Sequence, residues 1–294
     1  MNGYLYISCF SEFEIGLFPF QGLTFHSPSY INTLRMKCRR WYGMYNFFVD
    51  ACARLGDSFR ICGKDHNHIC NVLRMQTGDT FLVSCDGVSC LCRLERIEED
   101  AVVAAILEED YRNTELPVHF YLFQGLPKGD KLELIIQKTV ELGVAGIIPV
   151  EMSRCVMKLD DKKKKSRRER WQSIAESAAK QSKRNVIPQV SDVMTYKQAM
   201  AKAAEMDLFL VPYENENGMA ETRKALSRIR SGMSVGILIG PEGGFEEKEI
   251  ELARQTGAAV ISLGKRILRA ETAAVTAVGL GMLHVEMNLD GDKQ

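Results

Sequence analysis

The chain carries two glycine-bearing turns near its C-terminal end, and each directly follows a short apolar, β-branched run. One is Gly240-Pro241-Glu242-Gly243-Gly244-Phe245, and the other runs from Leu263-Gly264 to Thr272-Ala273. In an open α/β sheet, ligands bind outside the carboxyl ends of the strands, where glycine lets the backbone come close to them. Neither turn matches the G-x-G-x-x-G or the G-x-x-x-x-G-K-[ST] pattern. The pair therefore predicts a small-molecule pocket built mainly from backbone.

Strand-like and helical segments alternate after Pro117, which favours a parallel sheet covered by helices on both faces. The expected strands are 119–124, 146–150, 207–211, 235–240 and 258–263. The expected helices are 128–143, 167–183, 196–205, 220–230, 246–256 and 271–285. The pattern does not determine the order of the strands.

Residues 44–116 have a different rhythm, with short strand-like runs separated by turn signals such as Gly78-Asp79 and Asp86-Gly87. The runs are 47–49, 58–61, 80–84, 89–97 and 101–108, and one helix is expected at 65–75. This pattern predicts a small β-barrel. We thus expect a domain at 44–116 and a second, α/β domain at 117–290.

The first 43 residues show no helical or alternating period, and order begins abruptly at Met44. We interpret Met44 as a plausible initiator, and residues 1–43 as an extension that is dispensable or disordered.

Composition limits the function classes. The chain has 38 basic and 38 acidic residues, so any nucleic-acid binding must come from local patches. One candidate patch, Asp160–Arg170, holds seven cations, although charge runs are more often solvated linkers. The nine cysteines contain no C-x-x-C pair, the histidines have no metal-ligand spacing, and no signal peptide or membrane span is expected. These features favour a cytoplasmic protein with free thiols and no metal.

The paired turns resemble the cofactor loops of the SPOUT methyltransferases. Within that superfamily, Ile239–Phe245 (IGPEGGF) followed by LG-x-RILR-x-ETA at 263–273 resembles the RsmE family. The H-x-H-I element at His66–Ile69 and the VLR element at Val72–Arg74 are similar to the family's PUA-like domain. Val211-Pro212-Tyr213-Glu214 resembles the first cofactor loop, with a shorter match.

The resemblance implies a PUA-like RNA-binding barrel followed by a trefoil-knot domain that binds S-adenosylmethionine. It implies an S-adenosylmethionine-dependent methyltransferase that acts on N3 of a uridine in 16S ribosomal RNA of the small subunit. The cofactor residues that it implies are Leu210, Tyr213, Glu214, Ile239, Gly240, Glu242, Gly243, Gly244, Leu263, Gly264, Arg266, Ile267, Leu268, Thr272 and Ala273. The candidate RNA contacts are His68, Arg74, Lys128, Arg154, Lys158, Gln181 and Arg184.

Two charged residues are candidates for catalysis. Loss of the N3 proton spreads negative charge over the pyrimidine, so a positive clamp is useful, and Arg269 is the first choice. Glu242 is a candidate proton acceptor or ribose ligand. The alternative for both residues is an ion pair at helix ends.

Two other functions remain open: a related knotted enzyme acting on transfer RNA or a ribose hydroxyl, and a non-catalytic RNA-binding or assembly factor with this fold.

The segment 271–285 is apolar almost all round and needs burial on more than one side. Because knotted methyltransferases are typically dimers, we expect a homodimer with Arg269 near its boundary.

Overall fold

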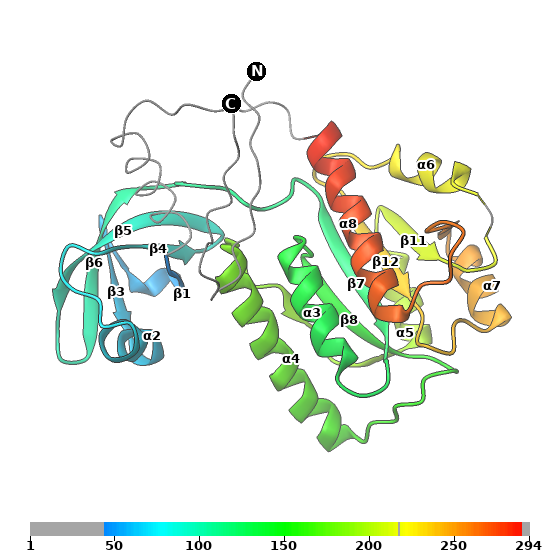
Figure 1. Ribbon diagram of the computed structural model, residues 1–294, viewed down its shortest axis with the longest axis horizontal. Coiled ribbons are helices and arrows are strands. Elements are labelled where there is room, and N and C mark those ends of the chain that lie inside the picture. Colours follow the sequence, from blue (N-terminus) through cyan, green and yellow to red (C-terminus); the bar gives the residue numbers. More distant parts are fainter. Residues whose placement is uncertain (1–43, 217, 290–294) are drawn as a thin grey trace, which may run out of the picture. The chain divides into compact units, whose positions relative to one another are not determined.

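The computed structural model describes residues 44–216 and 218–289, and they form two sheets with associated helices (Figure 1). The expectation for residues 1–43 lies outside the described residues. From Met44 onward the chain forms one compact unit.

The first sheet has six strands and curls as the barrel pattern predicts (Figure 1). Its order is β1-β4-β5-β6-β3-β2, with β1 parallel to β4 and the other neighbours antiparallel. No pairing joins β1 to β2 within the described residues, so the sheet is a half-barrel. The strands are β1 (Asn46–Val49), β2 (Arg54–Leu55), β3 (Ser58–Cys62), β4 (Thr80–Cys85), β5 (Val88–Ile97) and β6 (Ala101–Glu108).

Aromatic side chains contribute to a hydrophobic core on this sheet. Phe47, Phe59 and Phe81 are almost fully buried, and Phe47 and Phe81 meet edge-on at 5.4 Å between ring centroids. Edge-to-face contact is a favourable aromatic geometry. The sheet therefore has its own hydrophobic core.

The helix expected at 65–75 is shorter and is split in two. A short turn, η1 (Ala51–Ala53), precedes β2, and helix α2 (Gly63–Asn67) follows β3. α2 then widens into the π-type turn η2 (His68–Val72), where the Leu73 backbone N–H donates to the His68 carbonyl at 2.9 Å. The chain leaves this turn at Arg74, whose φ of 52° is incompatible with a right-handed helix.

The second sheet has seven strands, and all of its pairings are parallel. Its order is β10-β8-β7-β12-β11-β13, and β9 also pairs with β8. Continuous apolar strands are typical of a parallel sheet buried on both faces. The strands are β7 (His119–Gly125), β8 (Gly146–Glu151), β9 (Gln189–Val190), β10 (Met194–Thr195), β11 (Leu208–Pro212), β12 (Ser234–Ile239) and β13 (Ala259–Ile261).

Helices cover both faces of this sheet (Figure 1). α3, α4, α6 and α8 pack into one core, and α5 and α7 pack into a second core on the other face. The helices are α3 (Lys131–Glu141), α4 (Asp161–Ser182), α5 (Tyr196–Ala203), α6 (Ala220–Leu226), α7 (Glu247–Gln255) and α8 (Ala270–Asn288). The architecture therefore has the predicted mixed α/β class.

Helix α4 begins six residues earlier than the sequence pattern predicts, at Asp161 instead of Arg167. The Asp160 side chain caps it by accepting a hydrogen bond from the Lys163 backbone N–H at 2.8 Å. An acidic N-cap satisfies a free N–H group and offsets the helix dipole. The basic run is therefore part of a helix rather than a linker.

Candidate functional site

The carboxyl ends of β11, β12 and β13 meet at one edge of the parallel sheet, and the loops that follow them line two adjoining cavities. The larger has a volume of about 490 Å³ and the smaller about 100 Å³. Both cavities are lined by Pro212, Glu214, Ile267, Leu268 and Ala273. The larger is also lined by Lys131, Ile239, Gly240, Pro241, Glu242, Gly243, Gly244, Phe245, Arg269 and Ala270. The smaller is also lined by Tyr213, Ser262, Leu263, Gly264, Lys265 and Arg266.

Gly244 gives the loop after β12 its tight turn. Its φ is +68°, and its N–H donates to the Pro241 carbonyl at 2.9 Å. Phe245 turns into the core and is 5% exposed, and Glu246 then starts α7 through a capping box with Glu249. The loop is thus held at both ends while its backbone faces the cavity.

Gly243 is required for a different reason than the sequence analysis suggests. A Cβ at this position would lie 2.8 Å from the Cβ of Arg154, and the Arg154 guanidinium donates to the Gly243 carbonyl at 3.0 Å. The space beside Gly243 therefore belongs to Arg154 rather than to a ligand. Arg154, a predicted RNA contact, also joins the loop after β8 to the loop after β12.

The loop after β13 also depends on a left-handed glycine, since Gly264 has a φ of +106°. Ser262 fixes the start of this loop because its backbone exchanges two hydrogen bonds with the Thr222 hydroxyl, at 2.8 and 3.1 Å. Further along, Ile267 is 90% exposed although it borders both cavities. The loop after β13 therefore lines both cavities, and its part in binding a cofactor stays a prediction.

Charged side chains gather at the larger cavity: Lys131, Glu214, Glu242 and Arg269 line it, and Glu271 lies beside Lys131. Glu242 accepts hydrogen bonds from the Lys128 backbone N–H at 3.1 and 3.2 Å and from Lys131 Nζ at 2.8 Å. Lys131 Nζ also lies 3.8 Å from Glu271 Oε2. Arg269 lines the cavity as the N-cap residue of α8, and its side chain makes no ion pair within the described residues.

These contacts decide what Glu242 can do. Partial burial raises the pKa of Glu242, but hydrogen bonds from Lys131 and from the Lys128 backbone outweigh burial and hold it below its ordinary value. A carboxylate with a lowered pKa is a poor proton acceptor at neutral pH. Glu242 is therefore better suited to holding the loop after β12 against the segment between β7 and α3 than to acting as a general base.

The structure brings most of the predicted cofactor residues to the two cavities, with two exceptions. Leu210 is 2% exposed in the core beneath the site, and Thr272 is exposed on α8 and lines neither cavity. Sequence reasoning missed Lys131, which lines the larger cavity. Its only local signal is its place near the start of the helix expected at 128–143.

The predicted RNA contacts differ in how far their side chains are exposed to solvent. Arg74, Lys128, Arg154, Lys158 and Gln181 are exposed, and His68 is half-buried. Arg184 is buried: its guanidinium pairs with the Glu115 carboxylate and donates to the Val144 carbonyl. The prediction that Arg184 contacts RNA is therefore corrected, because the fold uses its charge internally.

The basic run on α4 is largely neutralised by neighbouring carboxylates. Lys163 pairs with Asp160 at 3.1 Å, and Lys164 pairs with Glu151 at 3.0 Å. The three arginines pair with Asp130, Glu133 and Asp192. Within the described residues only Lys162 and Lys165 of this run have no carboxylate within 4.0 Å. The patch that can attract phosphate is therefore smaller than the sequence suggests.

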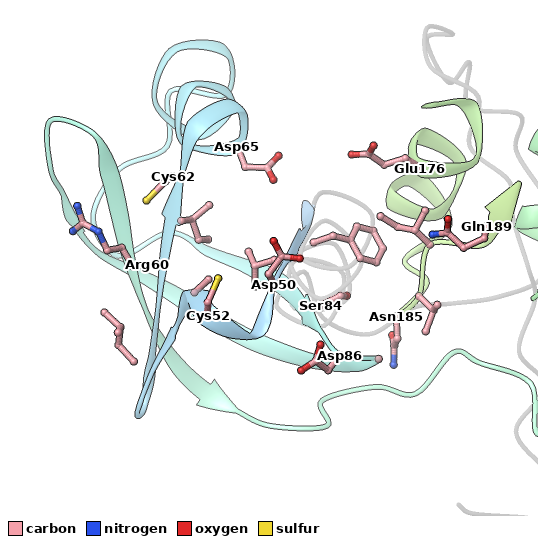
Figure 2. A pocket seen from close by; sticks show the side chains of 18 residues that line it. Asp50, Cys52, Arg60, Cys62, Asp65, Ser84, Asp86, Glu176, Asn185 and Gln189 are labelled. Atoms are coloured by element: carbon pink, nitrogen blue, oxygen red, sulfur yellow. The ribbon is translucent and has the colours of Figure 1, made fainter. Parts of the chain in front are cut away.

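A larger cleft of about 830 Å³ lies between the first sheet and the segments around α4 and β9 (Figure 2). Asp65 and Glu176 face one another across it, and Lys180 pairs with both, at 3.4 and 2.9 Å. Asp50 and Asp86 also line it and have no ion pair among the described residues. Because unpaired carboxylates repel phosphates, the parts of this cleft beside Asp50 and Asp86 disfavour RNA.

Comparison with known proteins identifies the class. Residues 114–282 match the protein-family model described as an RNA methyltransferase domain. Residues 61–107 match the family model described as an RNA methyltransferase PUA domain. With the parallel sheet and its glycine loops, these matches define an RNA methyltransferase of the SPOUT class.

A curated relative narrows this class to one family. "Ribosomal RNA small subunit methyltransferase E" of Bacillus subtilis is 41% identical over 240 residues, which cover 80% of this chain and 93% of the relative. The chain belongs to the ribosomal RNA small subunit methyltransferase E family.

Two solved structures are similar over nearly their full length. The Neisseria gonorrhoeae ribosomal RNA small subunit methyltransferase E bound to S-adenosylmethionine is 32% identical, with a TM-score of 0.69 over 81% of this chain and 96% of that one. A putative methyltransferase of Legionella pneumophila with bound S-adenosylmethionine is 29% identical, with a TM-score of 0.70 over 82% of this chain and 97% of that one.

Proposed function

We propose that this protein methylates N3 of a uridine in 16S ribosomal RNA of the small subunit, with S-adenosylmethionine as the methyl donor. The observation that carries the proposal is the joint pocket formed by the loops after β11, β12 and β13, in a chain that belongs to this family. The domain boundaries of 44–116 and 117–290 belong to the same proposal.

The residues at the pocket fit this cofactor. A cavity of about 490 Å³ lies within the usual range for small-molecule sites. Ile239 and Leu268 offer apolar contacts for the adenine, and Gly240 and Gly264 line the cavities beside them. Glu214 borders both cavities and can accept hydrogen bonds from hydroxyl or amino groups. When bound, S-adenosylmethionine supplies an electrophilic methyl group on a sulfonium.

The protein's own task is to bring the uracil imide to this pocket and to favour loss of its N3 proton. We assign Arg269 to this work, because its exposed guanidinium lines the cavity without an ion pair among the described residues. A fixed cation near the pyrimidine oxygens stabilises the charge that develops there. Glu242 holds the loop after β12 through Lys128 and Lys131.

RNA would be held by cations and polar groups outside the acidic cleft. The proposed contacts are His68, Arg74, Lys128, Arg154, Lys158 and Gln181. Because Arg154 also packs on Gly243, RNA contact at this residue would reach the cofactor loop directly.

The decisive test is methylation of small subunits from a strain that lacks the modification. We expect the purified protein to form N3-methyluridine in 16S RNA, detected by mass spectrometry of digested RNA, and to bind S-adenosylmethionine with saturable heat. A protein that binds RNA but gives no heat and no modified base is the non-catalytic factor. A methyl group on a ribose or on transfer RNA identifies the related enzyme.

We further propose a cytoplasmic homodimer that uses the outer side of α8. No helix in the described part of the chain is long and apolar enough to cross a membrane. Leu283 and Met287 on α8 are 49% and 74% exposed, as an interface requires, whereas Val278 is fully buried within the monomer. A Val278→Asp variant would therefore disrupt the hydrophobic core of the monomer. Leu283→Asp is the variant that tests the proposed interface, because Leu283 is exposed on the monomer. Sedimentation should show wild-type dimers and Leu283→Asp monomers, and an active wild-type monomer would contradict the dimer.

A further inference from the structure

Lys131 occupies an unusual position for a lysine. It is the first residue of α3, where the positive end of the helix dipole disfavours a cation. Its side chain nevertheless points to the wall of the cofactor cavity, where it lies with Glu242 and Arg269. Helix stability alone does not explain a cation here.

One carboxylate holds the ammonium through a hydrogen bond, and a second lies near it without one. Lys131 Nζ donates to Glu242 Oε1 at 2.8 Å and lies 3.8 Å from Glu271 Oε2. Glu242 is itself fixed by the Lys128 backbone N–H, and Glu271 lies in the first turn of α8. A lysine ammonium has three N–H donors, and the one hydrogen bond to Glu242 leaves donors free for a ligand.

We propose that Lys131 is a catalytic residue that donates a hydrogen bond to a uracil carbonyl oxygen as N3 loses its proton. The N3–H bond breaks, the proton passes to water, and the electron pair stays on N3 and spreads onto the two ring oxygens. Lys131 keeps its three protons throughout. Glu242 and Glu271 are positioning residues that act through it. This inference rests on the proposed function.

The charge state of Lys131 agrees with this role. The hydrogen bond from Lys131 to Glu242 raises the pKa of Lys131 above its ordinary value, so the ammonium does not act as the base. Its side chain is 37% exposed, which leaves access for a substrate. A donor already held in place costs little reorganisation when charge develops on the oxygen, and this is the main source of such stabilisation.

The test compares Lys131→Met with the wild-type protein in single-turnover methylation of unmodified small subunits, from neutral to alkaline pH. Lys138→Met is the matched control, since Lys138 lies on the same helix and also pairs with a glutamate. We expect the Lys131 variant to lose rate on the order of 100-fold at neutral pH. The loss should shrink as pH rises, because hydroxide then removes the proton without help. Lys131→Arg should keep most of the rate.

Two further measurements show whether the loss of rate has a structural cause. Calorimetric titration gives the affinity of each variant for S-adenosylmethionine, and thermal unfolding gives its melting temperature. Affinity and melting temperature near those of wild type support the catalytic role. A pH-independent loss, a loss explained by cofactor affinity, or a rate equal to that of Lys138→Met overturns it. If Lys131→Met does not fold, Lys131→Leu is judged by the same criteria, since it also removes the charge and every N–H donor. Failure of the wild type to form N3-methyluridine would instead contradict the proposed function.

Discussion

Gly243 and Gly244 are neighbours, but each is glycine for its own reason. Gly243 lacks room for a Cβ because Arg154 packs against it, whereas Gly244 needs a left-handed φ of +68°. A Cβ at Gly244 would also come 3.0 Å from a carboxylate oxygen of Glu214, which borders both cavities. Substitution at Gly244 therefore strains the turn and disturbs a residue of the pocket.

We predict that Gly244→Ala weakens binding of S-adenosylmethionine at least tenfold, about 1.4 kcal/mol, and lowers stability by about 1 kcal/mol. Calorimetry and thermal unfolding measure the two effects. The control is Gly232→Ala, since Gly232 also has a left-handed φ, of +83°, but has open space around it. Gly232→Ala should lose stability alone. Equal cofactor affinity in both variants would remove Gly244 from the site.

The cysteines of the first sheet illustrate how burial controls reactivity. Cys90 and Cys92 lie on one face of β5, as their spacing predicts, and both point into the core. Burial raises the pKa of the Cys92 thiol to about 12, whereas Cys52 and Cys62 are exposed. Because the thiolate is the nucleophile, Cys92 should be inert.

We predict that iodoacetamide at mildly alkaline pH modifies Cys52 and Cys62 in the native protein and leaves Cys92 unmodified. Peptide mapping by mass spectrometry measures this directly. Unfolding in denaturant should make Cys92 react at the rate of the other two. Rapid alkylation of Cys92 in the folded protein would contradict its burial.

Helix α4 combines a basic run with an acidic cap. Its hydrophobic residues, Trp171 and three alanines further along, pack into the core that α3 and α8 share. The cations at its start lie at the helix end where the dipole disfavours them, and Asp160 and neighbouring carboxylates compensate. The run thus has a structural part, Lys163 and Lys164, and an unpaired part, Lys162 and Lys165.

We predict that replacing Lys162 and Lys165 together by glutamine weakens RNA binding and reduces the slope of log K against log salt by about 1.5. The matched control is the double replacement of Lys163 and Lys164, which are already paired. The control should change the slope less and stability more. Titrations at several salt concentrations measure both slopes. Equal slopes in wild type and the Lys162/Lys165 variant would make the run purely structural.

The chain from Met44 onward contains both sheets and all three hydrophobic cores. The first sheet contacts the segment that follows α4, through the hydrogen bond from the Asn46 amide to the Arg184 carbonyl at 2.9 Å. These contacts lie wholly within this unit.

We predict that a protein beginning at Met44 folds, binds S-adenosylmethionine and methylates RNA as the full chain does. Thermal unfolding should show a melting temperature within a few degrees of the full chain, which corresponds to less than about 1 kcal/mol. A large fall in melting temperature or activity would show that residues 1–43 contribute to the fold.

Local sequence patterns predicted most helices and strands, because side-chain period depends only on neighbours along the chain. The two glycine turns were identified in the same way, since strand ends and glycines are local signals. The observed helix boundaries differ from the predicted ones where a capping residue determines the first turn, as Asp160 does for α4. The two-residue strands β9 and β10 were not predicted, because they are too short to show a period.

Only the tertiary structure determines which carboxylate pairs with each cation. Arg184 meets Glu115 across 69 residues, and Lys131 meets Glu242 across 111. No local pattern distinguishes these cations from the proposed RNA contacts, because the sequence does not show which carboxylate, if any, each cation meets in the fold. The parallel sheet brings β7 beside β12, and with it the start of α3 beside the cofactor loop. The sequence therefore predicts where the candidate pocket lies, because glycine turns at strand ends are local signals, and the folded arrangement decides which cations reach that pocket.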